Sequence, residues 1–590
     1  MDKAQEAGIK KDQEEKEQRH QHKHHQRNLS SQQHRNRRRS QEGLSRSSTA
    51  KFRALNNLRP HLPHLNIPVI EFPNQGSGTF SEFNQDAPIW ARQPFKYLYY
   101  AYFGLSVGLV YLPWWSVCSI IPSKRGRRSW TWKKATMVKL YRHGTKLTFR
   151  THTNLGRDLS REVPHSETLR CKFVWVDPLT KGEGSGVDGD IRGELLRAMK
   201  LQGIEAERTC GFWYGETDRD GGVGHRAAED EKVIYHLHGG AYWIGTAHES
   251  DVTSAVNTEV LRFLSELYAS KEPKTSRSSK AGKCSRTFSL DYRLCIPGKP
   301  QMGSYPAALL DAVAGYVYLV RSCGFKPENV VVAGDSAGGN LAIALCRYLR
   351  DEKVEAMPGS MLLMSPWADV SRSHSGPVGA PNLNSSAHKN RGCDIISPCL
   401  AFRNTAVSAF LGELPAREAY VNPYLSSISL QLPPHRGGVG PNWGFEGFPK
   451  KIYITSGSAE VSHDQHVTLA HRMAAGTRRG KPRYQGNRLS EGQDIHELSA
   501  RFTYPRPRDL KLSLLEVLDR DSGSSAPASE LEKEELGEER EVVLDEVKDA
   551  IHDYLLFGWF EPERSDTWRR IARWIDGAER EGEEGERVEL

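Results

Sequence analysis

Short apolar segments rich in β-branched residues recur from residue 232 onwards and alternate with longer stretches in which apolar residues follow a helical period. Alternation of this kind is typical of a mostly parallel sheet that helices cover on both faces. The pattern therefore predicts an α/β fold. We expect its strands at residues 232–235, 287–290, 329–333, 361–364, 451–454 and 542–544. Polar segments between them are expected to be surface loops, at about residues 216–230, 270–286, 370–392 and 476–540.

Composition divides the chain into four parts. Residues 1–60 form a basic, histidine-rich tail with almost nothing apolar to bury, so disorder is expected there. Residues 61–164 contain a long apolar segment. Residues 165–577 are expected to fold as one α/β domain, in which about 476–540 is disordered, and residues 578–590 form an acidic tail.

The apolar segment has no charged residue from Tyr97 to Ser123. One interpretation is a helix that spans a bilayer, with aromatic residues at its ends and basic residues beyond it. In the other, Pro113 splits the segment into two amphipathic helices of a cap over an apolar active site. Basic residues are more frequent after the segment than before it, which favours a cytosolic position for the following domain. We expect a membrane-associated protein, with the endoplasmic reticulum as the candidate membrane.

The composition also narrows the possible partners and cofactors. The net charge is +8, but the basic residues collect in the first fifty positions and after the apolar segment, so a solvated tail is expected and not a nucleic-acid surface. The nine cysteines have no ligand spacing, which predicts free thiols in a reducing compartment. No metal site is expected, since the histidines of the tail lack a fixed geometry.

Gly334-Asp335-Ser336-Ala337-Gly338 follows a predicted strand and precedes a helical stretch at residues 340–346. Glycines at both ends of this motif permit a tight turn from strand to helix, which presents the hydroxyl of Ser336 at the carboxyl edge of the sheet. The motif predicts a serine nucleophile.

A second glycine motif, His238-Gly239-Gly240-Ala241, closes the strand predicted at residues 232–235. Small residues after a strand can turn backbone amides toward a developing oxyanion. We expect the donors to be the amides of Gly239, Gly240 and Ala337.

The two motifs and their surroundings resemble the hormone-sensitive-lipase-like branch of the α/β-hydrolases, notably its fungal members of the steryl acetyl hydrolase type. The resemblance is carried by HLHGGAYWIGTA, SLDYRL, YPAALLDAVAGYVYL, VVVAGDSAGGNLA, MSPWADVS and VNPYLS. It implies an α/β-hydrolase fold, hydrolysis of carboxylic esters with apolar parts, no cofactor, and a cap built from the N-terminal region. Ala241 replaces a glycine that is common in that branch.

The order serine, acid, histidine then places the remaining catalytic residues. Glu460 follows the strand predicted at 451–454, and Asp464 is its rival one helical turn further on. For the base we expect His552, which follows the strand predicted at 542–544 and lies in DAIHDYLLFGWFEPER, a segment that resembles the terminal histidine motif of the branch. The other histidines beyond the acid are His463, His466, His471 and His496, the last of them in a polar stretch without a preceding strand.

The sequence therefore predicts a serine esterase or lipase that acts on lipophilic esters through an acyl-enzyme. His552 would accept the proton of Ser336, and Glu460 would orient the imidazole. Two alternatives stay open: a binding protein that kept the fold without turnover, and a membrane-tethered scaffold that uses the basic and acidic tails.

Overall fold

The computed structural model describes residues 88–153, 156–181, 189–217, 222–271, 282–376, 381–396, 400–432, 444–487 and 538–577. The predicted basic tail, the acidic tail and most of the insert at 476–540 lie outside the described residues.

A mixed sheet carries the fold, and its strands follow the order β1-β2-β4-β3-β5-β6-β7-β9-β8. β2 is antiparallel to both of its neighbours, whereas the strands from β4 to β8 along this order are parallel. The carboxyl ends of the parallel strands therefore share one edge. The strands are β1 (Cys171–Val176), β2 (Thr209–Gly215), β3 (Lys232–Leu237), β4 (Cys284–Asp291), β5 (Val330–Asp335), β6 (Ser360–Met364), β7 (Lys451–Gly457), β8 (Arg483–Gln485) and β9 (Glu541–Val547).

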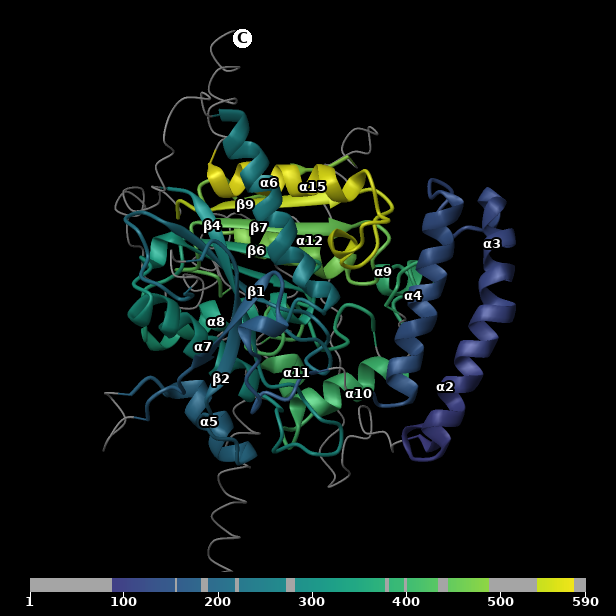
Figure 1. Cartoon of the computed structure of the whole chain (residues 1–590), viewed down its shortest axis with the longest axis horizontal. Coiled ribbons are helices and arrows are strands. Elements are labelled where there is room, and N and C mark those ends of the chain that lie inside the picture. The colour runs from purple at the N-terminus through teal and green to yellow at the C-terminus, as the bar shows by residue number, and fades with distance from the viewer. Residues whose placement is uncertain are drawn as a thin grey trace, which may run out of the picture. The chain divides into compact units, whose positions relative to one another are not determined.

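Alternate residues of one strand face two different helical layers. Ile234 of β3 lies in an apolar cluster with Val256 of α6 (Ala255–Lys271) and Ile571 of α15 (Glu563–Asp576), two helices that lie together in Figure 1. The next residue, Tyr235, donates its hydroxyl to the carbonyl of Ala312 in α7 (Ala307–Val317) at 2.8 Å. α7 packs on α8 (Ala337–Glu352). Helices thus cover both faces, and the predicted α/β fold is confirmed.

Every predicted strand overlaps an observed one, and three observed strands were not predicted. β1 and β2 lie at the antiparallel end of the sheet, where the aromatic residues of β2 are buried. β8 lies inside the predicted polar insert and has three residues, all half-buried, which pair with β9. So short and polar a strand has no apolar periodicity to reveal it.

The N-terminal apolar segment forms one continuous helical run. α2 (Phe95–Ser106) passes through a π-helical turn (Val107–Tyr111) into α3 (Leu112–Ile120). An 18-residue window of the run from Phe95 to Ile120 has a mean hydropathy of 1.4, and the run is, within the described residues, the helix that is long and apolar enough to cross a membrane, by length and composition alone. Pro113 is the second residue after the π-helical turn, in the first turn of α3, where a missing backbone donor is tolerated. The alternative in which Pro113 separates two helices is therefore wrong for this structure.

Two further helices and the state of the cysteines complete the description of the fold. α4 (Trp132–Arg150) packs beside α3. α12 (His463–Ala474) follows β7 and contacts β7 and β9. The cysteines that the structure describes, which are all except Cys399, are free, as the spacing predicts.

Candidate active site

Ser336 occupies a strained turn between β5 and α8. Its backbone has φ 50° and ψ −114°, a conformation that a residue other than glycine adopts only where the surrounding structure enforces it. A Cβ atom at Gly338 would lie 1.9 Å from the carbonyl oxygen of Leu237, and one at Gly334 would lie 2.3 Å from the carbonyl oxygen of Gly338. The two glycines are therefore required for the turn that presents the Ser336 hydroxyl.

Ser336, His552 and Glu460 form a continuous hydrogen-bonded line. The Oγ of Ser336 lies 2.8 Å from Nε2 of His552, and Nδ1 of His552 lies 3.1 Å from Oε2 of Glu460. Glu460 follows β7 and His552 follows β9, which are adjacent parallel strands. This adjacency explains how residues so far apart in the chain meet at one edge of the sheet.

The rival acid and the described rival histidines make other contacts, although His466 also approaches the site, with its Nδ1 4.0 Å from Oε2 of Glu460. The carboxylate of Asp464 accepts the amide of Ser386 at 2.7 Å. His463 and His466 face β7 and β9 from α12: His463 Nε2 lies 3.2 Å from Glu546, and His466 Nδ1 lies 2.8 Å from the Ser456 hydroxyl. His471 contacts the hydroxyl of Tyr484 at 2.5 Å. His496 lies outside the described residues.

Glu460 is fully buried and is held as an acceptor. Its Oε1 accepts hydrogen bonds from the Ser365 hydroxyl at 2.8 Å and from the Gly457 amide at 2.5 Å. Burial acts to raise the pKa of Glu460, but the imidazoles of His466 and His552 outweigh burial, and the pKa is lowered. The carboxylate therefore stays ionised at neutral pH.

A second carboxylate, Asp553, faces the imidazole that contacts Ser336. Its Oδ2 lies 3.1 Å from Nε2 of His552, the same nitrogen that faces the Ser336 hydroxyl. Burial acts to lower the pKa of His552, yet Asp553 and Glu460 raise it well above its ordinary value. Burial raises the pKa of Asp553 to about 7, against the opposite effect of His552. No sequence motif marks this contact, although Asp553 directly follows His552.

In the loop after β3, the amide of one of the two predicted oxyanion donors is already hydrogen-bonded within the protein. The Gly239 amide donates to Oδ2 of Asp335 at 2.9 Å, and Oδ1 of Asp335 lies 2.9 Å from Nε2 of the buried His236. An amide hydrogen that points at a carboxylate is not available to an oxyanion. The role predicted for Gly239 is therefore wrong in this structure, where Gly239 braces the loop.

The next residues of this loop turn the backbone toward the nucleophile's helix. Gly240, Ala241 and Tyr242 have φ values of 108°, 55° and 60°. A Cβ atom at Gly240 would lie 2.0 Å from the carbonyl oxygen of Ile244, so glycine is needed there. Within the described chain, the amides of Gly240, Ala241 and Ala337 have no hydrogen-bond acceptor in the protein. They are the groups left to bind an anion.

Ser365, just after β6, bonds to both loops that carry the acid and the base. Its hydroxyl donates to Oε1 of Glu460 and accepts the amide of Asp553 at 3.1 Å. Its own backbone has a positive φ of 45°. No sequence motif marks this role, because the two contacts come from segments that are remote in the chain.

Asp394 bridges the same two loops from a third direction. Its Oδ1 accepts the amide of His552 at 2.9 Å, and its Oδ2 accepts the amide of Val461 at 2.8 Å. Burial raises the pKa of Asp394 to about 6. The segment that carries it, at residues 385–396, lies at the end of a predicted polar insert, which gave no sign of a buried carboxylate.

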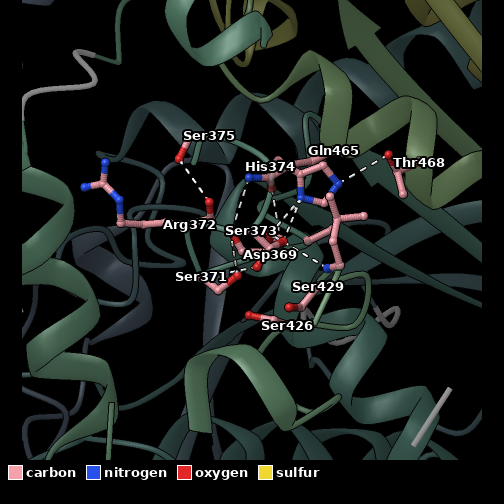
Figure 2. Close-up of polar contacts among 12 residues, drawn as sticks. Asp369, Ser371, Arg372, Ser373, His374, Ser375, Ser426, Ser429, Gln465 and Thr468 are labelled. Atoms are coloured by element: carbon pink, nitrogen blue, oxygen red, sulfur yellow. Dashed lines mark hydrogen bonds and ion pairs between the residues drawn. The ribbon is translucent and has the colours of Figure 1, made fainter. Parts of the chain in front are cut away.

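A separate cluster around Asp369 contains serine, histidine and aspartate but has a different geometry (Figure 2). Oδ2 of Asp369 accepts the Ser373 hydroxyl at 2.6 Å and lies 2.7 Å from Nδ1 of His374. The serine and the imidazole thus converge on one carboxylate oxygen and do not form a relay. Gln465 of α12 exchanges two hydrogen bonds with the backbone of Asp369, at 3.1 and 3.2 Å. This cluster fastens the loop after β6 to the helix that follows Glu460.

Comparisons with known proteins agree with this fold. Residues 275–486 match the family described as alpha/beta hydrolase fold. The sheet order, the turn at Ser336 and this match together define an α/β-hydrolase fold. Within the described ranges, no group of three or more histidine, cysteine or acidic side chains could hold a metal ion.

Several named proteins are similar over part of their length. An acetyl-hydrolase of Streptomyces hygroscopicus is 33% identical over 155 residues, 25% of this chain and 42% of the relative. The esterase LipU of Mycobacterium tuberculosis is 32% identical over 187 residues, 32% of this chain and 53% of the relative. Steryl acetyl hydrolase 1 of Saccharomyces cerevisiae is 41% identical over 76 residues, 13% of this chain and 18% of the relative. The chain thus spans about half or less of these relatives.

Proposed function

We propose that this protein is a serine hydrolase that cleaves carboxylic esters of lipophilic substrates through an acyl-enzyme. The observation that carries the proposal is the line from Ser336 through His552 to Glu460, with hydrogen-bond distances of 2.8 and 3.1 Å. The similarity to proteins named esterase and acetyl-hydrolase supports the reaction class. An acetylated lipid is a candidate substrate, because one similar protein is named a steryl acetyl hydrolase.

In the proposed reaction, the Ser336 hydroxyl gives its proton to Nε2 of His552 as Oγ attacks the ester carbonyl. Glu460 keeps Nδ1 of His552 protonated and stabilises the imidazolium. The amides of Gly240, Ala241 and Ala337 would bind the oxyanion. His552 then protonates the leaving alcohol, and water, deprotonated by the same imidazole, releases the acid from the acyl-enzyme. No cofactor enters these steps.

The test is a Ser336→Ala variant assayed with a p-nitrophenyl ester and with a fluorophosphonate probe that labels active serines. We expect no hydrolysis above background and no labelling, with an unchanged circular dichroism spectrum. Turnover retained by Ser336→Ala would exclude this mechanism. Absence of turnover and of labelling in the unaltered protein would favour a binding protein with this fold.

We further propose that the helical run Phe95–Ile120 holds the protein on a membrane, with the endoplasmic reticulum as the candidate and the catalytic region on the cytosolic side. Its apolar side chains are largely exposed, and the run has an excess of positive charge on its C-terminal side. The basic residues at its N-terminal end are Arg92, before it, and Lys96, in its first turn, and those after it are Lys124, Arg125, Arg127, Arg128, Lys133 and Lys134. Co-flotation with microsomes on a density gradient tests the attachment, and recovery in the soluble fractions would contradict it.

A further inference from the structure

The exposed side chains of the apolar run form one stripe along its length. Leu98, Tyr102, Leu105 and Leu109 follow one another at intervals of four, three and four residues, which places them on one helical face. Within the π-helical turn the stripe shifts by one position, and it continues through residues 110, 114 and 117. These side chains are exposed to between 59% and 74%. An apolar stripe of this length on a folded surface calls for an apolar partner.

The opposite face of the run is covered by α4. The Arg150 guanidinium donates to the Tyr99 hydroxyl at 2.9 Å near one end, and Lys139 donates to the Ser119 hydroxyl at 3.0 Å near the other. Between them, the ring of His143 lies 5.0 Å from the rings of Phe103 and Tyr111. The two helical segments therefore lie alongside each other over most of their length.

α4 is strongly basic. It contains no acidic residue. Its charged and titratable side chains are Lys133, Lys134, Lys139, Arg142, His143, Lys146 and Arg150. Several of them contact the apolar run directly, so a bilayer-spanning pose of the run would carry α4 into the hydrocarbon core. Charges at that depth are costly unless paired, and α4 has no carboxylate of its own to pair them.

α4 is also fixed to the catalytic region. Lys134 forms an ion pair with Glu563 at 2.6 Å. Tyr141 packs edge-on against Phe557 with ring centroids 4.7 Å apart, and Arg142 donates to the carbonyl of Asp394 at 3.1 Å. Phe557 and Asp394 belong to the segments that carry or bridge His552. α4 therefore cannot follow the run into a bilayer without leaving the active site.

We propose that the helical run lies in the plane of the membrane surface and does not cross it. Its exposed stripe enters the acyl region of one leaflet, while its other face stays on α4. Exposed basic residues beyond the two ends of the run face anionic headgroups. They are Arg92 before the run, and Lys124, Arg128 and Lys133 after it. The inference rests on the proposed membrane attachment and gives it a geometry that leaves both ends of the chain on one side of the membrane.

α4 also connects the run to the region of the active site. The helix that lies under the run contacts Phe557 and the carbonyl of Asp394, and Asp394 in turn accepts the amide of His552. The run that enters the leaflet is therefore linked through α4 to the segments that hold His552.

The first test measures whether the exposed stripe binds the protein to lipid vesicles. The full chain with Leu105→Glu and Leu109→Glu is compared with the unaltered protein for flotation with vesicles of phosphatidylcholine containing about one quarter phosphatidylserine. The matched control carries Leu169→Glu and Leu383→Glu, two leucines of the catalytic region that are 91% and 61% exposed. We expect the stripe variant to lose about tenfold in bound fraction and the control to bind as the unaltered protein does. If the stripe variant floats with the vesicles to the same extent as the unaltered protein, the proposal is overturned.

The second test separates lying in the membrane from crossing it. The full chain, with one epitope tag at each end, is placed in sealed microsomes and treated with protease from outside. Removal of both tags supports the in-plane arrangement on the cytosolic side, and protection of both supports it on the lumenal side. Protection of one tag alone shows a spanning helix and overturns the proposal. Hydrolysis of a soluble ester is measured in the same samples, so failure of the proposed esterase activity is seen separately.

Discussion

At the scale of single residues, the structure ranks the two candidate acids. Oε2 of Glu460 lies 3.1 Å from Nδ1 of His552, whereas Asp464 is bonded to the amide of Ser386. We expect Glu460→Gln to lower kcat by roughly a thousandfold or more, because an amide at this position no longer stabilises the imidazolium. Asp464→Asn is expected to lower it by less than about tenfold. Initial rates with a p-nitrophenyl ester give the ranking, and the reverse order would move the acid to Asp464.

The contact between Asp553 and His552 predicts a pH effect. The reaction needs a neutral His552, so activity is lost as the pH falls through the pKa of this imidazole. Burial acts to lower that pKa, and Asp553 is the first of the carboxylates that raise it. Removing the charge with Asp553→Asn should therefore lower the pKa and extend activity to lower pH.

The measurement is the acid limb of the profile of kcat/KM against pH. We expect the limb of Asp553→Asn to move down by about one unit or more. Asp566→Asn, which changes a half-exposed carboxylate on α15, is the matched control and should leave the limb in place. An unmoved or raised limb in Asp553→Asn would show that Asp553 does not govern the proton on His552.

Residue roles differ in how far the sequence could predict them. Ser336 and His552 lie in recognisable motifs next to predicted strands, and the structure brings them together with Glu460. Gly239 lies in a motif too, but its amide is taken by Asp335, a contact between two strand ends that a linear pattern does not show. The contacts of Ser365 and Asp394 join segments remote in the chain, and no local periodicity signals them.

At the scale of elements, the loop after β6 connects the parts of the site. The Trp367 amide donates to the carbonyl of Ser336 at 2.8 Å, and Ser365 bonds to Glu460 and Asp553. The Asp369 cluster secures the far end of this loop to α12 (Figure 2). The loop therefore sets the spacing between the nucleophile and the acid.

Asp369→Asn should destabilise the fold. Burial acts to raise the pKa of Asp369, but the hydrogen bond and charge of His374 hold it far below its ordinary value. Such a group adds stability above its unfolded pKa of about 4, and this contribution shrinks as the pH falls from there toward the much lower pKa of the folded state. We expect the free energy of unfolding at pH 7 to fall by about 3 kcal/mol, because a fully buried partner of His374 is lost.

Urea unfolding at two pH values tests this effect. The difference in unfolding free energy between Asp369→Asn and the unaltered protein should narrow below about pH 4, where the carboxylate of the unfolded chain accepts a proton and the native one does not. As a control, Asp566→Asn changes an exposed carboxylate and should alter the free energy of unfolding by less than about 0.5 kcal/mol. A destabilisation of Asp369→Asn that is the same at both pH values would exclude the charged pair as its source.

The strands from β3 to β7, and β9, could be predicted from their apolar residues, whereas β8 and the path of the N-terminal run could not. The strands from β3 to β9 that flank the site have continuous apolar cores. β8 pairs with β9 through its backbone, and this pairing does not require a particular pattern of side chains. In the N-terminal run, proline alone suggested a break, but the π-helical turn before Pro113 removes the need for one.

At the scale of the whole molecule, the proposed esterase and the proposed in-plane helix make a joint prediction about substrates. A membrane-bound enzyme meets an ester dissolved in the leaflet at a high local concentration, and a soluble ester reaches it from bulk water in either state. The stripe variant with Leu105→Glu and Leu109→Glu should therefore hydrolyse a vesicle-embedded ester about tenfold more slowly at low lipid concentration. Its rate on p-nitrophenyl acetate should equal that of the unaltered protein.

Raising the lipid concentration gives the decisive control, because weaker binding is overcome by mass action whereas a damaged site is not. The rates of the two proteins on the embedded ester should converge as lipid increases, and the control with Leu169→Glu and Leu383→Glu should match the unaltered protein throughout. An equal loss on the soluble and the embedded ester would show that the stripe supports the active site through α4 and does not act by binding lipid.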